Sequence, residues 1–126
     1  MVMVKGSALF DTNILIDLFS GRNEAKLAIE TWPPQNAISL ITWMEVMVGA
    51  KKYHQEARTR VALGAFNVIG VSQDIAERSV SIRQEYGMKL PDAIILATAQ
   101  IHRLTLVTRN TKDFAGLSGV VTPYTL

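Results

Sequence analysis

Cysteine is absent from all 126 residues of the chain, and this absence excludes disulfide bonds and thiolate metal sites. No apolar run approaches the roughly 18 residues that a membrane-spanning helix needs. The N-terminal string MVMVKGSALFDTN reaches charged and turn-forming residues too early for the apolar stretch of a signal peptide. We therefore expect a soluble protein of the reducing cytoplasm that does not associate with a membrane.

Histidine is scarce, and charge of either sign is not gathered into blocks. The two histidines, His54 and His102, fall at or beyond the ends of expected helices, where the helix dipole favours them, and we assign neither to catalysis. The net charge is only +2. If four acids shared one pocket, the remaining surface would be basic and would attract a polyanion.

The composition that is present, 48% hydrophobic and 19% charged, is typical of a compact soluble protein. A chain of this length forms one domain with a real core, so we expect a single domain over 1–126. Apolar strands are predicted at residues 5–10, 37–41, 68–71, 105–107 and 120–121. Helices are predicted at 12–19, 24–32, 43–52, 54–66, 73–86 and 91–102. This alternation predicts an α/β fold with a central, mostly parallel sheet of four to five strands flanked by helices.

Four acids stand where strands end or helices begin, namely Asp11, Glu45, Asp92 and Asp113. Three of them directly follow predicted strands, and Asp92 starts the helix before the fourth strand. Ligands of open α/β sheets bind beyond the carboxyl ends of the strands. Carboxylates gathered there would repel one another unless a cation lay between them, and oxygen ligands favour Mg²⁺ or Mn²⁺. This pattern suits metal-assisted cleavage of a phosphodiester.

Each acid also has an ordinary structural explanation. Asp11 could cap the helix that follows it. Thr42 and Glu45 match a capping box, in which the third helical residue reaches back to the cap. Asp92 could complement a helix dipole, and Asp113 could belong to a turn. Caps alone have no reason to fall at one end of one sheet, so we favour a shared pocket.

Three polar residues are candidates for supporting roles. Asn13 could orient a ligand water or a phosphate, or simply be solvated on its helix. Thr108 and Asn110 could hold Asp113 through hydrogen bonds, as the residues around a metal ligand often do.

Two charged residues near these positions are interpreted differently. Arg109, beside the proposed pocket, is the candidate for a contact to the phosphate backbone of a substrate. Asp17, on the first helix, is expected to be solvated. The helix predicted at 43–52 is apolar nearly all round, so part of it could form an interface, although core burial is the leading explanation.

The motifs together resemble those of PIN-domain ribonucleases, most closely VapC-type toxins of toxin–antitoxin pairs. The matching strings are DTNILIDLF, SLITWMEVMVGA, LPDAIILATA and LVTRNTKDF, which span nearly the whole chain in the family's order. The resemblance implies a PIN-like three-layer sandwich. It assigns catalysis and the binding of one or two Mg²⁺ or Mn²⁺ ions to an acidic quartet, which here is Asp11, Glu45, Asp92 and Asp113. It places Asn13 and Thr108 at supporting polar positions.

The same resemblance implies partners. The substrate would be RNA, the chain would form a homodimer, and a cognate antitoxin would lie across the early helices and reach the pocket. A carboxylate–metal site lowers the pKa of bound water. We therefore predict endonucleolytic hydrolysis by metal-activated water, leaving a 5′-phosphate and a 3′-hydroxyl.

Other functions are considered beside this one. A PIN-like domain could bind RNA or a partner without turnover. A receiver-like Mg²⁺-binding signalling domain needs an aspartate after the third strand and a lysine after the last, but NVIGVS has no acid and LVTRN offers Arg109. A carboxylate phosphatase needs a second aspartate where Asn13 stands.

Overall fold

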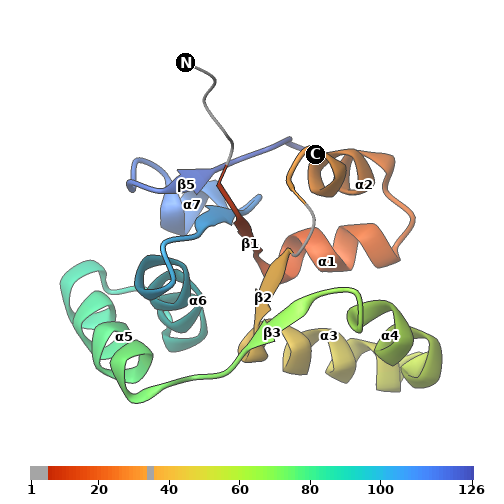
Figure 1. The fold of residues 1–126 in the computed structure, drawn as a ribbon, viewed down its shortest axis with the longest axis horizontal. Helices are drawn as coiled ribbons and strands as arrows, with labels where there is room; N and C mark the ends of the chain where they lie inside the picture. The colour runs from red at the N-terminus through yellow and green to blue at the C-terminus, as the bar shows by residue number, and fades with distance from the viewer. Residues whose placement is uncertain (1–5, 34–35) are drawn as a thin grey trace.

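A computed structural model describes residues 6–33 and 36–126, in which a five-stranded sheet lies between two layers of helices (Figure 1). The strands are β1 (Ala8–Phe10), β2 (Ala37–Ser39), β3 (Asn67–Ile69), β4 (Thr105–Val107) and β5 (Val120–Val121). The helices are α1 (Thr12–Phe19), α2 (Asn23–Glu30), α3 (Leu40–Lys52), α4 (Glu56–Leu63), α5 (Gln73–Tyr86), α6 (Leu90–Ile101) and α7 (Thr111–Phe114). Lys5, at which the first strand was predicted to begin, lies outside the described residues.

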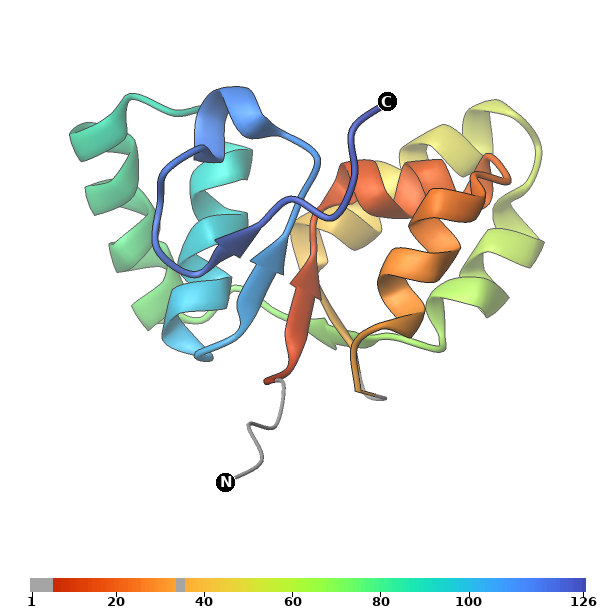
Figure 2. The ribbon, with the colours of Figure 1, turned by 90° about the horizontal axis from the view of Figure 1, so that it is seen from above.

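The sheet has the order β3-β2-β1-β4-β5, and each neighbouring pair is parallel. Leu9 of β1 is in register with Ala37 on one side and Leu106 on the other. The chain runs outward from β1 to β3 and then returns to β4 on the opposite side of β1. This reversal creates a topological switch point between β1 and β4, where residues that follow the two strands share one crevice. Figure 2 shows the two arrows pointing the same way, with α1 and α7 beyond their tips.

Alternation along the strands divides the core into two clusters. Leu9 and Leu106 face a cluster that includes buried residues of α5, α6 and α7. Their neighbours Phe10 and Val107 face the other cluster, which includes buried residues of α1, α3 and α4. Successive side chains of a strand point to opposite faces, so both faces of this sheet are apolar and covered. The predicted three-layer α/β fold with a parallel sheet is confirmed.

The start of α3 differs from the prediction. β2 ends at Ser39, whose side chain accepts a hydrogen bond from the backbone N–H of Ile41 at 3.1 Å and caps the helix. The helix therefore begins at Leu40, and Thr42 is a buried residue of its first turn. The capping box proposed for Thr42 and Glu45 is wrong, which leaves the Glu45 carboxylate available for contacts outside its own helix.

The segments around α4 and α7 also differ from the prediction. The predicted helix at 54–66 is shortened at both ends to α4, and His54 at its predicted start takes a left-handed conformation with φ of 58°, which a helix does not contain. The predicted turn before Asp113 is instead the short helix α7, capped by Asn110. None of the helices described has the length and apolar character needed to cross a membrane.

Candidate active site

Asp11 lies at the switch point, directly after the central strand β1. Its backbone N–H donates to the carbonyl of Val107 at 2.9 Å, which fixes the residue against the end of β4. Its side chain caps α1, because Oδ1 accepts from the backbone N–H of Thr12 at 2.7 Å. The residue is only 4% exposed. The cap proposed from the sequence therefore exists, and it orients one carboxylate oxygen and leaves the other for a second set of contacts.

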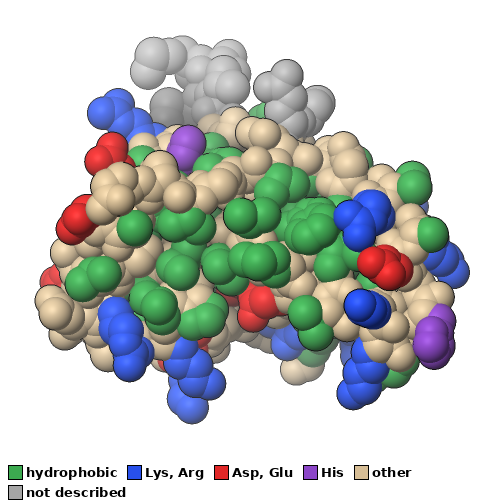
Figure 3. Space-filling view, turned by 90° about the horizontal axis from the view of Figure 1, so that it is seen from below, with side chains coloured by type: hydrophobic (Ala, Val, Ile, Leu, Met, Phe, Trp, Pro, Cys, Tyr) green, Lys and Arg blue, Asp and Glu red, His purple; other side chains and the backbone are tan. Residues whose placement is uncertain are grey.

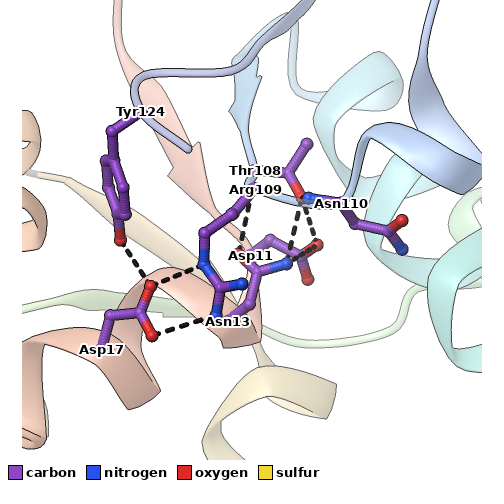
Figure 4. Close-up of polar contacts among 7 residues, drawn as sticks. All are labelled: Asp11, Asn13, Asp17, Thr108, Arg109, Asn110 and Tyr124. Carbon is purple, nitrogen blue, oxygen red and sulfur yellow. Dashed lines mark hydrogen bonds and ion pairs between the residues drawn. The ribbon is translucent and has the colours of Figure 1, made fainter. Parts of the chain in front are cut away.

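Asn13 and Thr108 surround that second oxygen. The Thr108 hydroxyl donates to Asp11 Oδ2 at 2.7 Å, and the Asn13 amide nitrogen lies 3.4 Å from the same oxygen (Figure 4). The Asn13 nitrogen is also 3.3 Å from the Thr108 hydroxyl oxygen. The structure thus brings together two of the predicted supporting residues. Thr108 was expected to hold Asp113, but it holds Asp11 instead.

Burial is the main reason why the pKa of Asp11 rises from 3.8 to about 6. Hydrogen bonds from the Thr108 hydroxyl and from the N–H of Thr12 oppose this rise, while the charges of Asp92 and Glu45 add to it. Burial also raises the pKa of Asp92, and the charges of Asp113 and Glu45 raise it further. The four predicted acids therefore belong to one electrostatically linked cluster.

Glu45 projects from the second turn of α3 and is held by a residue that sequence reasoning did not select. The Thr12 hydroxyl donates to Glu45 Oε1 at 2.7 Å. Thr12 and Thr42 are 3.0 Å apart through their hydroxyl oxygens, and since the Thr12 proton goes to Glu45, Thr42 is the donor in that pair. The available signal was the threonine between Asp11 and Asn13 in a polar string that directly follows a buried strand.

Asp113 is an exposed residue of α7 and is anchored locally. Asn110 accepts a hydrogen bond from the backbone N–H of Asp113 at 3.1 Å and donates one to its Oδ2 at 2.9 Å. The backbone N–H of Asn110 in turn donates to the Thr108 hydroxyl oxygen at 3.0 Å. The predicted contact from Asn110 to Asp113 is confirmed. Because Asn110 also donates to Thr108, and Thr108 donates to Asp11, these hydrogen bonds connect Asp113 to Asp11.

Asp17 and Arg109 do not match their predicted surroundings. Asp17 is 5% exposed, so the expectation that it is solvated is wrong. Arg109 donates to it from Nε at 2.7 Å and from Nη2 at 3.0 Å, and Tyr124 donates to it from its hydroxyl at 2.7 Å. The guanidinium that was predicted to contact substrate is therefore paired with a carboxylate of its own chain.

The donor set is suited to a divalent cation that keeps part of its water shell. Within the described ranges, no three acidic or histidine side chains are placed closely enough to hold one ion together. Mg²⁺ is commonly bound by one or two carboxylates together with several waters. No salt bridge to a Lys or Arg compensates the four acids among the residues described. Asp11, which is buried, and Asp92, which is half-buried, both have a raised pKa and are the groups that a cation would stabilise in the charged form.

A mostly apolar groove of about 270 Å³ begins beside the acidic cluster and runs between α1, α3 and α4. Its lining includes Ile16, Phe19, Val46, Tyr53 and, at one end, Glu45. Elsewhere, exposed hydrophobic side chains occur on α3 and along the β3 edge of the sheet. Figure 3 shows hydrophobic side chains gathered across the middle of the face that carries β3, with acidic groups below their centre.

The helix predicted at 43–52 divides its apolar residues between core and surface. Val46 and Met47 are buried, while Met44 and Val48 are 43% and 71% exposed. Core burial therefore explains one face of α3 only, and Met44 and Val48 leave apolar surface exposed outside the core.

Comparison with known proteins places these features in a family. The sequence model of one protein family, the PIN domain, matches residues 8–119. A curated relative, Ribonuclease VapC1 of Methanocaldococcus jannaschii, is 32% identical over 114 residues, which cover 86% of this chain and 79% of the relative.

Solved structures share the fold. A chain of a toxin–antitoxin complex from Klebsiella pneumoniae is 82% identical, with a TM-score of 0.93 over 95% of this chain and 100% of that one. A chain of VapBC2 from Rickettsia felis, bound to a DNA fragment from its promoter, shares the fold at 21% identity, with a TM-score of 0.77 over 90% of this chain and 95% of that one.

Proposed function

Because the chain belongs to the PIN domain family, we propose that it is a divalent-metal-dependent endoribonuclease and the toxin of a toxin–antitoxin pair. The ribonuclease named among its relatives supports the activity, and the toxin–antitoxin complexes support the pairing. Family membership argues against the receiver-like and phosphatase alternatives.

The observation that carries this proposal is the environment of the Asp11 carboxylate. It is a buried carboxylate at the switch point of a parallel sheet, near two further acids and without a cationic side chain paired to it in the described structure. Burying a carboxylate in this way is unfavourable for folding unless something else requires it. Perturbed acids in such a crevice mark a functional site.

Asp11 and Asp92 are the principal candidates to hold the cation, which we propose to be Mg²⁺ or Mn²⁺. Asp11 is fixed on both oxygens by Thr12 and Thr108, and Asp92 is half-buried in the first turn of α6. A divalent cation bound here would lower the pKa of the attacking water and neutralise charge on the phosphate.

Glu45 and Asp113 complete the quartet from opposite sides. Glu45 is exposed but oriented by Thr12, so it is suited to orient the attacking water or to share in cation binding. Asp113 is exposed and held by Asn110, so it is suited to a second cation position or to a contact through water. These assignments for the four acids are part of the proposal.

The proposed products carry a 5′-phosphate and a 3′-hydroxyl. Cleavage through the neighbouring 2′-hydroxyl needs a general acid and base of suitable pKa, a task most often given to histidine. His54 is exposed in the turn between α3 and α4, and His102 caps the far end of α6. Neither is placed with the acids, so hydrolysis by water is the favoured route.

The partners proposed are RNA, a cognate antitoxin and a second copy of the chain, acting in the cytoplasm. The groove that ends at Glu45 suits an apolar antitoxin segment, since a ligand lying in it would reach the acids. The apolar side chains of the β3 face suit a self-complementary dimer contact.

The test is cleavage of end-labelled total RNA by the antitoxin-free protein. Wild type is compared with Asp11→Asn, and with Asp74→Asn as a matched control on the exposed first turn of α5. We expect fragments with 5′-phosphates from wild type and Asp74→Asn in Mg²⁺ or Mn²⁺. We expect none with chelator and none from Asp11→Asn.

Two outcomes would contradict the proposal. Cleavage that persists in chelator, or ends that carry a cyclic phosphate, would exclude the metal-dependent hydrolysis. Binding of Mn²⁺ and of RNA without cleavage of any species in the pool would instead favour a PIN-like domain that binds without turnover.

A further inference from the structure

Asp17 receives three hydrogen bonds although it lies outside the acidic quartet. Arg109 donates to both of its carboxylate oxygens, and Tyr124 donates to Oδ2, all between 2.7 and 3.0 Å. These groups come from α1, from the loop after β4 and from the segment after β5, as Figure 4 shows. Burial alone would raise the pKa of Asp17, but the hydrogen bonds from Arg109 and Tyr124 outweigh it and lower the pKa, so Asp17 is ionised.

Such a cluster is expected to add little to the free energy of unfolding. Removing a carboxylate and a guanidinium from water costs free energy that their attraction often fails to recover. A bidentate pair does, however, fix the relative position of two segments with more precision than apolar packing. The pair between Asp17 and Arg109 therefore fixes the position of Arg109 relative to α1.

Arg109 is held to α1 at two points. Its guanidinium binds Asp17, and its backbone N–H donates to Asn13 Oδ1 at 3.1 Å. Asn13 and Asp17 are four residues apart on α1, so they project from the same face of the helix. One helix face thus holds both the side chain and the main chain of the same residue.

The main-chain contact reaches the acidic cluster directly. With its oxygen engaged by Arg109, the Asn13 amide presents its nitrogen to Asp11 Oδ2 and to Thr108. Thr108, the residue before Arg109, donates to the same oxygen of Asp11. Displacing Arg109 would therefore displace both groups that hold this oxygen.

We propose that Asp17, Arg109 and Tyr124 form a positioning clamp that sets the geometry of Asp11 and, through it, the cation affinity and turnover of the site. None of the three contacts RNA or the cation in this role. The inference rests on the proposed function for its effect on turnover, and on the geometry alone for its effect on Asn13 and Thr108. It replaces the expectation that Arg109 is a substrate contact.

The test compares Asp17→Asn, Arg109→Lys and Tyr124→Phe with Glu56→Gln. The last variant breaks the exposed Arg60–Glu56 pair, a matched ion pair that lies 3.3 Å apart on α4. Four quantities are measured on the full chain: Mn²⁺ affinity without RNA, kcat for RNA, KM for RNA, and the hydrogen-exchange rate of the Arg109 amide.

We expect Asp17→Asn and Arg109→Lys to weaken Mn²⁺ binding and to lower kcat by about tenfold or more, as for residues that orient metal ligands. KM should stay near the wild-type value. Exchange of the Arg109 amide should accelerate, while that of the Asp11 amide, which is bonded to Val107, should not. Tyr124→Phe removes one hydrogen bond and keeps the ring, so it should shift each quantity in the same direction by less. Glu56→Gln should shift none.

Two results would overturn the clamp, and a third would reduce it to Asp17 and Arg109. A raised KM with unchanged kcat and Mn²⁺ affinity would return Arg109 to the substrate. A lower melting temperature with unchanged exchange, affinity and kcat would make the cluster merely structural. Unchanged behaviour of Tyr124→Phe would remove the C-terminal segment from it, and this variant serves if Asp17→Asn fails to fold.

The readouts also separate this inference from the proposed function. If wild type binds no Mn²⁺ and cleaves no RNA, the proposed function fails. The exchange of the Arg109 amide in the variants still decides whether the clamp positions the loop.

Discussion

Thr12 donates a hydrogen bond to Glu45 across 33 positions of sequence, at 2.7 Å. The bond joins the first residue of α1 to the second turn of α3, and it orients an exposed carboxylate that has few other constraints. The backbone N–H of Thr12 donates to Asp11 Oδ1, which caps α1. One residue therefore relates two of the four acids to each other.

Replacing Thr12 by Val is expected to lower kcat for RNA by about tenfold or more, since the hydroxyl that orients Glu45 is lost. The backbone bond to Asp11 is kept, so the fold should be retained, but the buried Thr42 hydroxyl loses its acceptor and the melting temperature should fall. Steady-state cleavage assays and thermal unfolding measure the two quantities. Thr12→Ser keeps the hydroxyl and should retain most of the activity. Equal activity in the Val and Ser variants would show that Glu45 does not need this bond.

The free energy of unfolding of the cation-free protein is expected to depend on pH through the ionisation of Asp11. Its pKa is about 6 in the folded state and near 3.9 in unfolded chains, so between these values the folded state binds more protons. The free energy of unfolding must then fall as pH rises through this interval, by about 3 kcal/mol for this group. Urea unfolding in chelator from pH 4 to pH 8 measures the effect as wild type minus Asp11→Asn.

Asp74→Asn is the control for that measurement, because Asp74 is exposed in the first turn of α5. Its pH dependence should match that of wild type. A difference curve between wild type and Asp11→Asn that is flat, or that rises with pH, would contradict the raised pKa of Asp11.

Cation binding is expected to depend on pH for the same reason, because a proton competes for the Asp11 carboxylate. Below about pH 6 the apparent Mn²⁺ affinity should fall by up to tenfold per pH unit, and above it the affinity should level off. At about 100 times its dissociation constant, Mn²⁺ should stabilise the folded protein by about 2.7 kcal/mol. Calorimetric titration and thermal unfolding measure these effects. An affinity that is independent of pH would remove Asp11 from the binding site.

The groove beside Glu45 is expected to bind the antitoxin through its apolar lining. Ile16 is 50% exposed there, so Ile16→Ser should weaken the complex at least tenfold with little effect on the free protein. Leu27→Ser is the matched control, since Leu27 is 53% exposed on α2 outside this groove. Binding of the cognate antitoxin is measured by titration, and RNA cleavage by the free chain should be unaffected in both variants. Equal loss of binding in the two would place the antitoxin elsewhere.

The sheet and the four acids could be predicted because their signals are local. Short apolar runs followed at once by a carboxylate occur within a few residues, and parallel strands then bring their ends to one side. The start of α3 could not be decided in this way. Ser39 and Thr42 are both good caps, and only the point at which β2 leaves the sheet selects Ser39.

The contacts that refine the site were invisible for a different reason. Asp17 pairs with a residue 92 positions away and accepts from another 107 positions away. On its own helix it has the pattern of a solvated aspartate. Thr108 was predicted to hold Asp113 but holds Asp11, because proximity in sequence favours Asp113 and the register of β1 beside β4 favours Asp11.

The order of the strands has a consequence for how the protein is made. β1 is the central strand, but the Thr108 hydroxyl that completes the Asp11 environment follows β4 and is translated 97 residues after Asp11. Because domains fold as units during synthesis, the acidic cluster stays unassembled until β4 has emerged from the ribosome and paired with β1. A nascent chain that ends before β4 therefore contains Asp11 without the contact that orients its second carboxylate oxygen.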